Sequence, residues 1–149
     1  MTARKGGFTL VELLIVIMII AILAGMMMLA NSFATDSAEA TRIINDLRNL
    51  KSAALLYYGD NLKWPTNSDV KSLDQYADRA FTSRYDSVVI GGEYTVDGVT
   101  KINIGLVLSD DKVSPSVQNK LASRAADSGL YGTGNVVYTS GTTIYMNMR

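Results

Sequence analysis

The chain has 149 residues, with no cysteine and no histidine, and its 14 basic residues balance 14 acidic ones. This composition excludes disulfides, cysteine nucleophiles, histidine bases and the usual zinc sites, and the neutral charge gives no support for nucleic-acid binding through phosphate contacts. The length leaves room for one folded domain of about 110 residues after Ala34, enough for a modest core.

A short basic segment opens the chain, and a long apolar run follows it. Arg4 and Lys5 precede the stretch from Phe8 to Ala30, in which Glu12 is the one charged residue. A helix over 8–30 would be roughly 30 Å long, which is enough to cross a bilayer core. Basic residues before the run and acidic residues after it predict that the following part of the chain lies outside the cytoplasm.

Glu12 is the most informative residue of this run. An ionised carboxylate inside a membrane-spanning helix costs about 2.5–3.5 kcal/mol at the bilayer centre and less near an end, so it calls for a partner. The spacing Thr9-x-x-Glu12 also fits a helix capping box, in which the two side chains satisfy amides of the first turn. Both interpretations remain open at this point.

The segment Gly6-Gly7-Phe8-Thr9-Leu10-Val11-Glu12 and its aliphatic continuation resemble the class III signal of type IV pilins and type II secretion pseudopilins. The resemblance is close only up to Ala30. It implies that a prepilin peptidase/methyltransferase cuts after Gly7, so that 1–7 is a leader, and methylates the new terminus at Phe8. It also implies that Glu12 pairs with the Phe8 ammonium of an adjacent copy in a helical homopolymer.

The same resemblance gives the apolar run two successive environments. Residues 8–30 first anchor a single-pass precursor in the inner membrane and then, with the help of the inner-membrane assembly machinery, form the filament core. No proline interrupts this run, in contrast to many relatives, and Gly25 is its one weak point for a helix. The expected core positions are Leu10, Leu13, Leu14, Ile17, Ile20, Leu23 and Gly25.

Two other interpretations compete for this region. In an ordinary secretory signal, Ser32-Phe33-Ala34 would be the cleavage site, but the apolar run is longer than the usual 7–15 residues or so and contains Glu12. A plain single-span anchor is the second alternative. The Gly7-Phe8 junction with its spaced glutamate argues against it.

Beyond the apolar run the pattern becomes that of an amphipathic helix, about 36–58, which continues the first helix and belongs to a globular head, 31–149. Gly59 supplies a stop signal. The apolar residues recur at intervals of three and four: Ala40, Ile43, Ile44, Leu47, Leu50, Ala54 and Tyr57.

The head has signals for further helices and for two hairpins. A short helix is expected over 69–80, capped by Ser68, with Val70, Leu73, Tyr76 and Ala77 on one face. Asp97-Gly98 predicts a tight turn between 94–96 and a strand over 101–108. Ser114-Pro115 opens a helix to about Ala126, and a second hairpin is expected between 136–138 and 143–148. The predicted fold class is α+β: a long helix packed against a small antiparallel sheet, as in pilins.

Signals for chemistry are weak. Ser109, Asp110 and Asp111 offer oxygens to a hard cation, but without a recognisable loop motif. The glycine-rich segment 131–135 is not followed by a Walker lysine and is expected to be a surface connection. We therefore expect no metal, no cofactor and no enzyme activity.

Three functions remain for such a chain. The first is a structural subunit of an extracellular type IV pilus, used in adhesion or surface motility. The second is a pseudopilin, forming a short periplasmic filament of a type II secretion system. The third is a binding module or enzyme anchored in the membrane, which would tolerate replacement of its anchor by an unrelated span.

Overall fold

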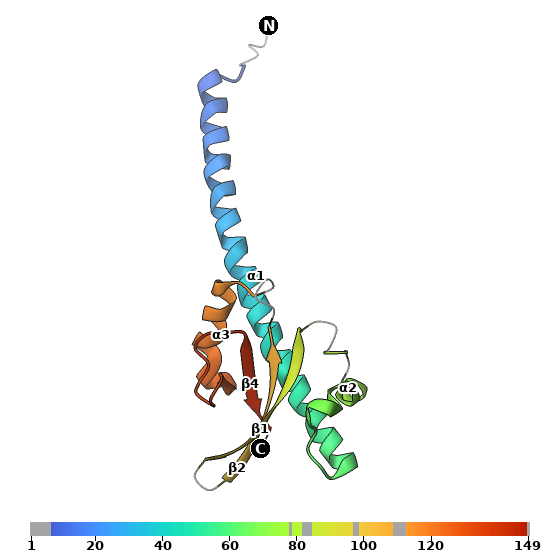
Figure 1. Ribbon diagram of the computed structural model, residues 1–149. Helices are drawn as coiled ribbons and strands as arrows, with labels where there is room; N and C mark the ends of the chain where they lie inside the picture. Colours follow the sequence, from blue (N-terminus) through green and yellow to red (C-terminus); the bar gives the residue numbers. More distant parts are fainter. Residues whose placement is uncertain (1–6, 78, 82–84, 97–98, 109–112, 149) are drawn as a thin grey trace. The chain divides into compact units, whose positions relative to one another are not determined.

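The computed structural model describes residues 7–77, 79–81, 85–96, 99–108 and 113–148 (Figure 1). The chain divides into two compact units, 1–35 and 36–149, and helix α1 contributes to both. The elements are α1 (Leu10–Asn61), η1 (Asn67–Asp69), α2 (Val70–Leu73), η2 (Asp74–Tyr76), β1 (Ser87–Val96), β2 (Val99–Val107), α3 (Pro115–Ser128), β3 (Leu130–Tyr131) and β4 (Thr143–Asn147).

Helix α1 confirms the expected long helix and extends it by one turn at its carboxyl end. It begins two residues after Phe8 and ends at Asn61, beyond the predicted stop at Gly59. Gly25 does not interrupt it. A single glycine costs a helix about 1 kcal/mol relative to alanine, which is small beside the hydrogen bonds of the flanking turns.

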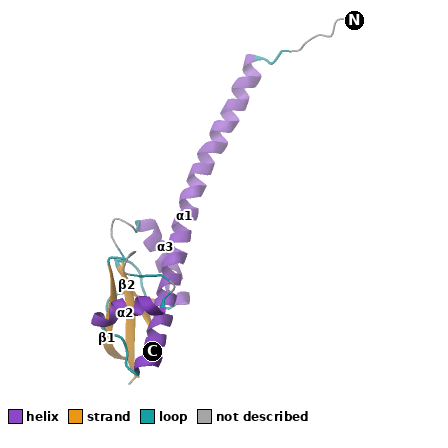
Figure 2. Cartoon of the chain, turned by 90° about the vertical axis from the view of Figure 1, so that its right-hand side faces the viewer, coloured by secondary structure: helices purple, strands orange, loops and turns teal. Residues whose placement is uncertain are grey.

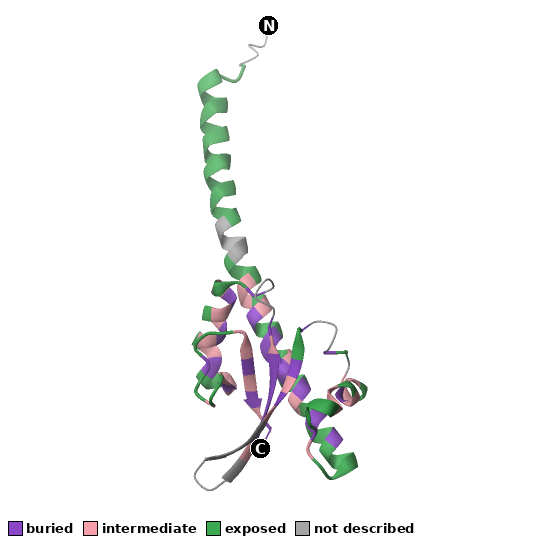
Figure 3. Ribbon diagram, viewed as in Figure 1, coloured by how far each residue is buried: buried purple, intermediate pink, exposed green. Residues whose placement is uncertain are grey.

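The second unit is built around the carboxyl part of α1 and a four-stranded antiparallel sheet with the strand order β1-β2-β4-β3. Figure 2 shows this part of α1 lying along one face of the sheet, and Figure 3 shows buried residues on both elements. The amphipathic face of α1 is buried as the periodicity predicts, and α3 adds a further apolar face from Val117, Leu121 and Ala125. The α+β class and the pilin-like arrangement are confirmed.

The first hairpin is confirmed. Val96 pairs with Val99, so two residues, Asp97-Gly98, connect β1 and β2; they lie outside the described residues. Strand β1 begins earlier than the sequence suggests, at Ser87, and its register shifts between Ile90 and Glu93. Two glycines therefore face one partner residue there, which is the geometry of a β-bulge.

The second hairpin is wrong. The predicted second hairpin pairs segment 136–138 with the strand that is β4 in the structure. Strand β4 pairs with β2 on one side and with β3 on the other, so neither of its edges is free for 136–138. Instead Tyr138 turns inward: its side chain is 1% exposed, and its hydroxyl donates to the Gly141 carbonyl at 2.7 Å. Val137 instead forms an isolated bridge with Tyr131, on the β3 side of the sheet, which is not part of the expected pairing. The inward aromatic ring outweighs the local turn signal.

The helix over 69–80 is also wrong in its bounds and its cap. Three short helical segments, η1, α2 and η2, cover Asn67 to Tyr76. Thr66, not Ser68, precedes them, and its N–H and hydroxyl both donate to the Asp69 carboxylate, at 3.0 and 2.8 Å. After Tyr76 the backbone becomes extended at Ala77. The apolar face is as expected, with Leu73 buried against the core.

Helix α3 follows its capping signals. The Ser114 hydroxyl oxygen accepts from the Val117 N–H at 3.3 Å, Pro115 occupies the first turn, and Gly129 ends the helix in the left-handed conformation at φ 66°. The helix continues to Ser128, two residues beyond the expected end. The surface connection expected over 131–135 is found at 132–135, whereas Tyr131 belongs to β3.

Candidate functional site

The amino-terminal end of α1 contains the capping box that the Thr9–Glu12 spacing predicts. The Glu12 amide donates to the Thr9 hydroxyl oxygen at 3.2 Å, and Glu12 Oε2 accepts from the Thr9 N–H at 3.2 Å and from its hydroxyl at 3.1 Å. The box fixes the first helical turn. Both donors to the carboxylate are neutral groups, so the box supplies hydrogen bonds to Glu12 but no counterion.

The residues of the expected cleavage site lie just before this turn and are open to solvent. Phe8 is 87% exposed, and an added Cβ at Gly7 would meet nothing within 4 Å. The site of the expected processing is therefore accessible. The structure brings Thr9 and Glu12 together but describes no second copy, so the pairing between Glu12 and another Phe8 remains a prediction.

The side chains from Leu10 to Met28 are all exposed (Figure 3). The expected filament-core positions are among them, from Leu14 at 48% to Leu10 at 81% exposed. Among the described residues, α1 is the one helix long and apolar enough to cross a membrane, and none of its apolar window is buried. An apolar surface of this length needs lipid or protein around it.

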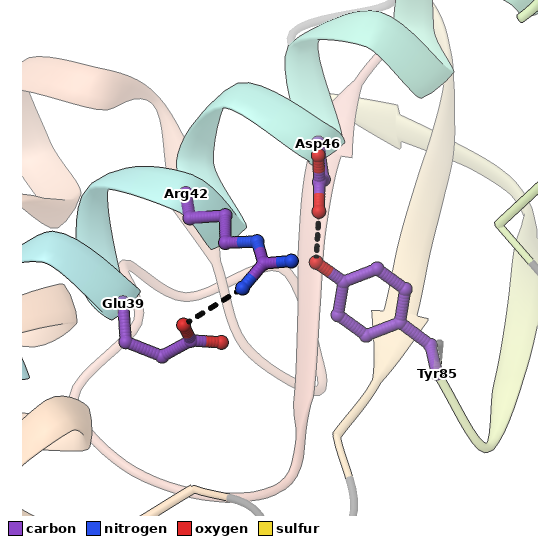
Figure 4. Close-up of polar contacts among 4 residues, drawn as sticks. All are labelled: Glu39, Arg42, Asp46 and Tyr85. Atoms are coloured by element: carbon purple, nitrogen blue, oxygen red, sulfur yellow. Dashed lines mark hydrogen bonds and ion pairs between the residues drawn. The ribbon is translucent and has the colours of Figure 1, made fainter. Parts of the chain in front are cut away.

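The second unit contains a polar cluster that sequence analysis missed (Figure 4). The Tyr85 hydroxyl donates to the Asp46 carboxylate at 2.5 Å, and Arg42 Nη1 lies 3.5 Å from Glu39 Oε2. Burial, and then the hydrogen bond to Asp46, raises the pKa of Tyr85 above its ordinary value. The hydrogen bond between Tyr85 and Asp46 holds the segment before β1 against α1, so we assign it a structural role. Residues 39 positions apart give no local signal.

A groove of about 400 Å³ lies where the chain leaves α1. It is lined by Trp64, Pro65, Thr66, Asn67, Ile90, Gly91 and Ile102. Trp64 stacks on Tyr58 with ring centroids 4.5 Å apart, and the Ile90 N–H donates to Asn67 Oδ1 at 2.7 Å. The two aromatic rings therefore pack on each other at the point where the chain leaves α1.

Metal chemistry gains no support from the described part of the chain, where no group of three or more Asp or Glu side chains is placed to hold an ion. The candidate cation ligands Ser109, Asp110 and Asp111 lie outside the described residues.

A family model describes the segment that contains the capping box. Residues 2–28 match the prokaryotic N-terminal methylation motif. The chain is related to type IV pilins and type II secretion pseudopilins. The motif match covers the exposed apolar stretch of α1 as far as Met28.

Three relatives show the extent of the similarity. A type IV major pilin protein, PilE1, of Neisseria gonorrhoeae is 40% identical over 68 residues, 46% of this chain and 41% of the relative. Another protein of that description from the same species is 32% identical over 123 residues, 80% of this chain and 51% of the relative. The type II secretion system core protein G of Klebsiella pneumoniae is 33% identical over 63 residues, 42% of this chain and 45% of the relative.

The chain thus spans about half the length of the curated relatives that it matches. No solved structure matches it significantly. The relatives are described as type IV major pilin proteins, fimbrial proteins and a core protein G of a type II secretion system.

Proposed function

We propose that this chain is a structural subunit that polymerises into an extracellular type IV pilus through residues 8–30. One observation supports the proposal above the others. A single carboxylate, Glu12, stands in the exposed apolar stretch of α1 from Leu10 to Met28, four residues after Phe8 at the Gly7-Phe8 junction that the methylation motif covers. Such a charge is costly in lipid and becomes useful when another copy supplies its counterion.

In the proposed mechanism, cleavage after Gly7 creates an ammonium group on Phe8. In a staggered array of parallel helices this group approaches Glu12 of an adjacent copy. The capping bonds from Thr9 occupy Oε2 but do not neutralise the charge. An ion pair in an apolar core is favourable when each charge also has hydrogen-bond partners, and the capping box provides these for Glu12.

The proposed precursor is a single-pass protein of the inner membrane with the head, 31–149, outside the cytoplasm. On assembly the apolar side chains of α1 exchange lipid contacts for contacts with neighbouring helices. This exchange is nearly neutral in hydrophobic free energy, because lipid tails are as apolar as leucine. Charge pairing and close packing then determine the position of the entering subunit.

A type II secretion pseudopilin is the second candidate, because a core protein G is among the relatives. The same amino-terminal chemistry serves both functions, and the filament differs in length and place. Long filaments on the cell surface identify a pilus. Their absence, together with a defect in protein secretion when the chain is deleted, identifies a pseudopilin.

The experiment that tests the proposed function has two readouts. Surface filaments are sheared from cells and imaged by electron microscopy, and the mass of the purified subunit is measured. We expect visible filaments built from a chain that begins at a methylated Phe8. A subunit that begins at Met1 or Thr35, or that occurs only as dispersed monomers, would contradict the proposal.

A further inference from the structure

Arg124 of α3 joins α3 to α1 without a charged partner. Its Nη1 donates to the Thr41 hydroxyl oxygen at 2.7 Å, and its Nη2 donates to the Ser37 hydroxyl oxygen at 2.8 Å. The two hydroxyls lie one turn apart on α1, which runs beside α3 (Figures 1 and 2). Among the described residues no carboxylate forms an ion pair with Arg124, whereas Arg42 on α1 lies 3.5 Å from Glu39 Oε2.

The side chains of this cluster carry more hydrogen-bond donors than acceptors. A guanidinium has five N–H donors and no acceptor, and two of the five are used here. The Thr41 hydroxyl donates its proton to the Ser37 carbonyl at 2.8 Å. Within the described part of the chain the Ser37 hydroxyl has one contact, in which it accepts from Arg124. The cluster therefore retains three N–H donors, one O–H donor and the charge of Arg124.

This excess of donors and positive charge is complementary to an oxyanion. Thr41 is exposed, and Ser37 and Arg124 are half-buried, so a ligand can reach the cluster. The fork of N–H groups on a guanidinium matches the geometry of phosphate oxygens, which accept several hydrogen bonds at once. A carboxylate in place of either hydroxyl would neutralise Arg124 within the chain. The two neutral hydroxyls position the guanidinium and leave its charge for an external anion.

We propose that Ser37, Thr41 and Arg124 form a binding site for the phosphate group of an anionic phospholipid. We name these three residues the oxyanion site. The inference rests on the proposed function, because it needs a precursor that is anchored in the membrane. It adds a contact between the head and the lipid surface, which is made before the subunit enters a filament.

The length of chain between the anchor and the oxyanion site favours a lipid as the source of the phosphate. Ser37 follows Ala30, the last residue of the apolar run, by seven residues, which is roughly 10 Å of helix. The headgroup layer occupies roughly the first 5–7 Å outside the hydrocarbon core. The chain therefore holds the site near headgroup phosphates whatever angle the two units make. One phosphate contact binds a free ligand weakly, but a tethered site meets these phosphates at a high effective concentration.

The site is tested by native mass spectrometry of the full chain, extracted from membranes in a neutral detergent. Phosphatidylglycerol or phosphatidylcholine is added, and the bound lipid is counted. We expect the chain to retain one phosphatidylglycerol several-fold more strongly than phosphatidylcholine, whose choline group neutralises the phosphate. Arg124→Gln should reduce the retention of phosphatidylglycerol about five- to tenfold. Equal retention by this variant and by the unmodified chain would overturn the site.

Arg48→Gln is the matched control, because it removes the same charge from an exposed position of α1 outside the oxyanion site. It should retain phosphatidylglycerol as the unmodified chain does. Arg4 and Lys5 are present in all these chains, so any lipid that they bind cancels in the comparison. A loss with Arg48→Gln as large as that with Arg124→Gln would reduce the effect to net charge and would contradict a specific site.

Ser37→Asp separates lipid binding from the fold. The added carboxylate lies beside Arg124 and neutralises it, so the melting temperature of the head in detergent should stay the same or rise. Retention of phosphatidylglycerol should nevertheless fall as far as with Arg124→Gln. If Ser37→Asp retains the lipid, the loss with Arg124→Gln comes from a disturbed contact between α3 and α1, and the proposal is wrong.

Inorganic phosphate in millimolar excess distinguishes the two sources of a phosphate group. We expect it to leave the lipid bound. Displacement of the lipid by inorganic phosphate, from the unmodified chain, would assign the site to a soluble ligand and overturn the lipid assignment. Failure of the proposed function looks different, because a chain that is absent from the membrane fraction has no anchor. An anchored chain without selectivity for phosphatidylglycerol fails the oxyanion site alone.

Discussion

The two parts of α1 have the same secondary structure and opposite surroundings. From Leu10 to Met28 every side chain is exposed, whereas from Ala40 to Tyr57 one face is buried under the sheet. The first part is apolar on all sides and the second is amphipathic. The apolar face of the second part is buried within its own chain. The apolar surface of the first part can be covered only by lipid or by other protein molecules.

The largest effect is expected when the apolar part of α1, from Leu10 to Met28, is kept in the uncleaved precursor. We expect Gly7→Glu to prevent cleavage and thereby abolish filaments, while the head folds normally, because an added Cβ at Gly7 meets nothing within 4 Å. The measurement is the mass of the membrane-extracted chain, which should include residues 1–7. Efficient processing of this variant would refute the assignment of the junction.

Glu12→Gln tests the charge within the first part. Glutamine still fits a capping box, so the helix keeps its first turn, but the ammonium of a neighbouring Phe8 loses its counterion. Removal of one partner from a buried ion pair costs about 3–5 kcal/mol, so filaments should fall more than tenfold while the chain remains in the membrane.

Thr9→Ala is the matched control for this variant. It removes the capping hydroxyl, at a cost of about 1 kcal/mol to the helix end, and keeps the charge of Glu12. Filaments should therefore persist. A loss of filaments with Thr9→Ala as large as that with Glu12→Gln would show that the order of the first helical turn limits assembly, and would contradict a specific role for the charge of Glu12.

How far the sequence predicts this molecule depends on the range of each signal. Helix α1, helix α3 and the first hairpin are marked by local patterns: periodicity, Ser114-Pro115 and Asp97-Gly98. The Thr9–Glu12 box is equally local, and the structure contains it. Within the candidate site, the contact between Thr9 and Glu12 could therefore be predicted from the sequence. The proposed counterion of Glu12 belongs to another copy of the chain, so no pattern within one chain can show it.

The failures share one physical cause, which is competition from contacts distant in sequence. Tyr138 is drawn into the core, and with β3 already beside β4 the segment 136–138 forms no strand. The hydrogen bond from Tyr85 to Asp46 spans 39 positions, and no periodicity announces it. Such contacts are decided by packing of the whole unit, which local propensity does not contain.

Substitutions of single leucines sharpen the comparison in energetic terms. Leu47→Ala removes a fully buried side chain of the second part and should lower the free energy of unfolding by about 2–5 kcal/mol. Leu14→Ala removes a side chain that is 48% exposed in the first part and should leave head unfolding unchanged. Urea denaturation in detergent measures both. Equal effects would show that the two units unfold together.

Gly105→Ala probes the sheet against which the second part packs. A Cβ at Gly105 would lie 2.5 Å from Tyr145 Cδ1 and 2.7 Å from the Ile144 carbonyl oxygen, and the backbone oxygen has no room to move. We expect a loss of about 1–3 kcal/mol, from strain between β2 and β4. The matched control is Gly59→Ala, because a Cβ at Gly59 on α1 meets nothing within 4 Å; this variant should leave the free energy of unfolding unchanged or raise it. Gly134→Ala is unsuitable because φ at Gly134 is +81°.

The smallest expected effect concerns the contact that holds the chain before β1 on α1. Tyr85→Phe removes one hydrogen bond to Asp46 and should cost about 1 kcal/mol at neutral pH. Because burial and this bond raise the pKa of Tyr85, the folded chain keeps a proton that the unfolded chain releases above its ordinary pKa of about 10. The stabilisation is therefore complete below pH 10 and is lost as the pH rises further.

Denaturation curves at pH 8 to 11 measure this effect. The free energy of unfolding should fall less steeply with pH for Tyr85→Phe than for the unmodified chain. Asp46→Asn, which keeps an acceptor but removes the charge, should give an intermediate slope, since burial still disfavours the phenolate. Parallel slopes for all three chains would contradict the raised pKa of Tyr85, and an unchanged free energy of unfolding of Tyr85→Phe at neutral pH would mean that the hydrogen bond contributes nothing to stability.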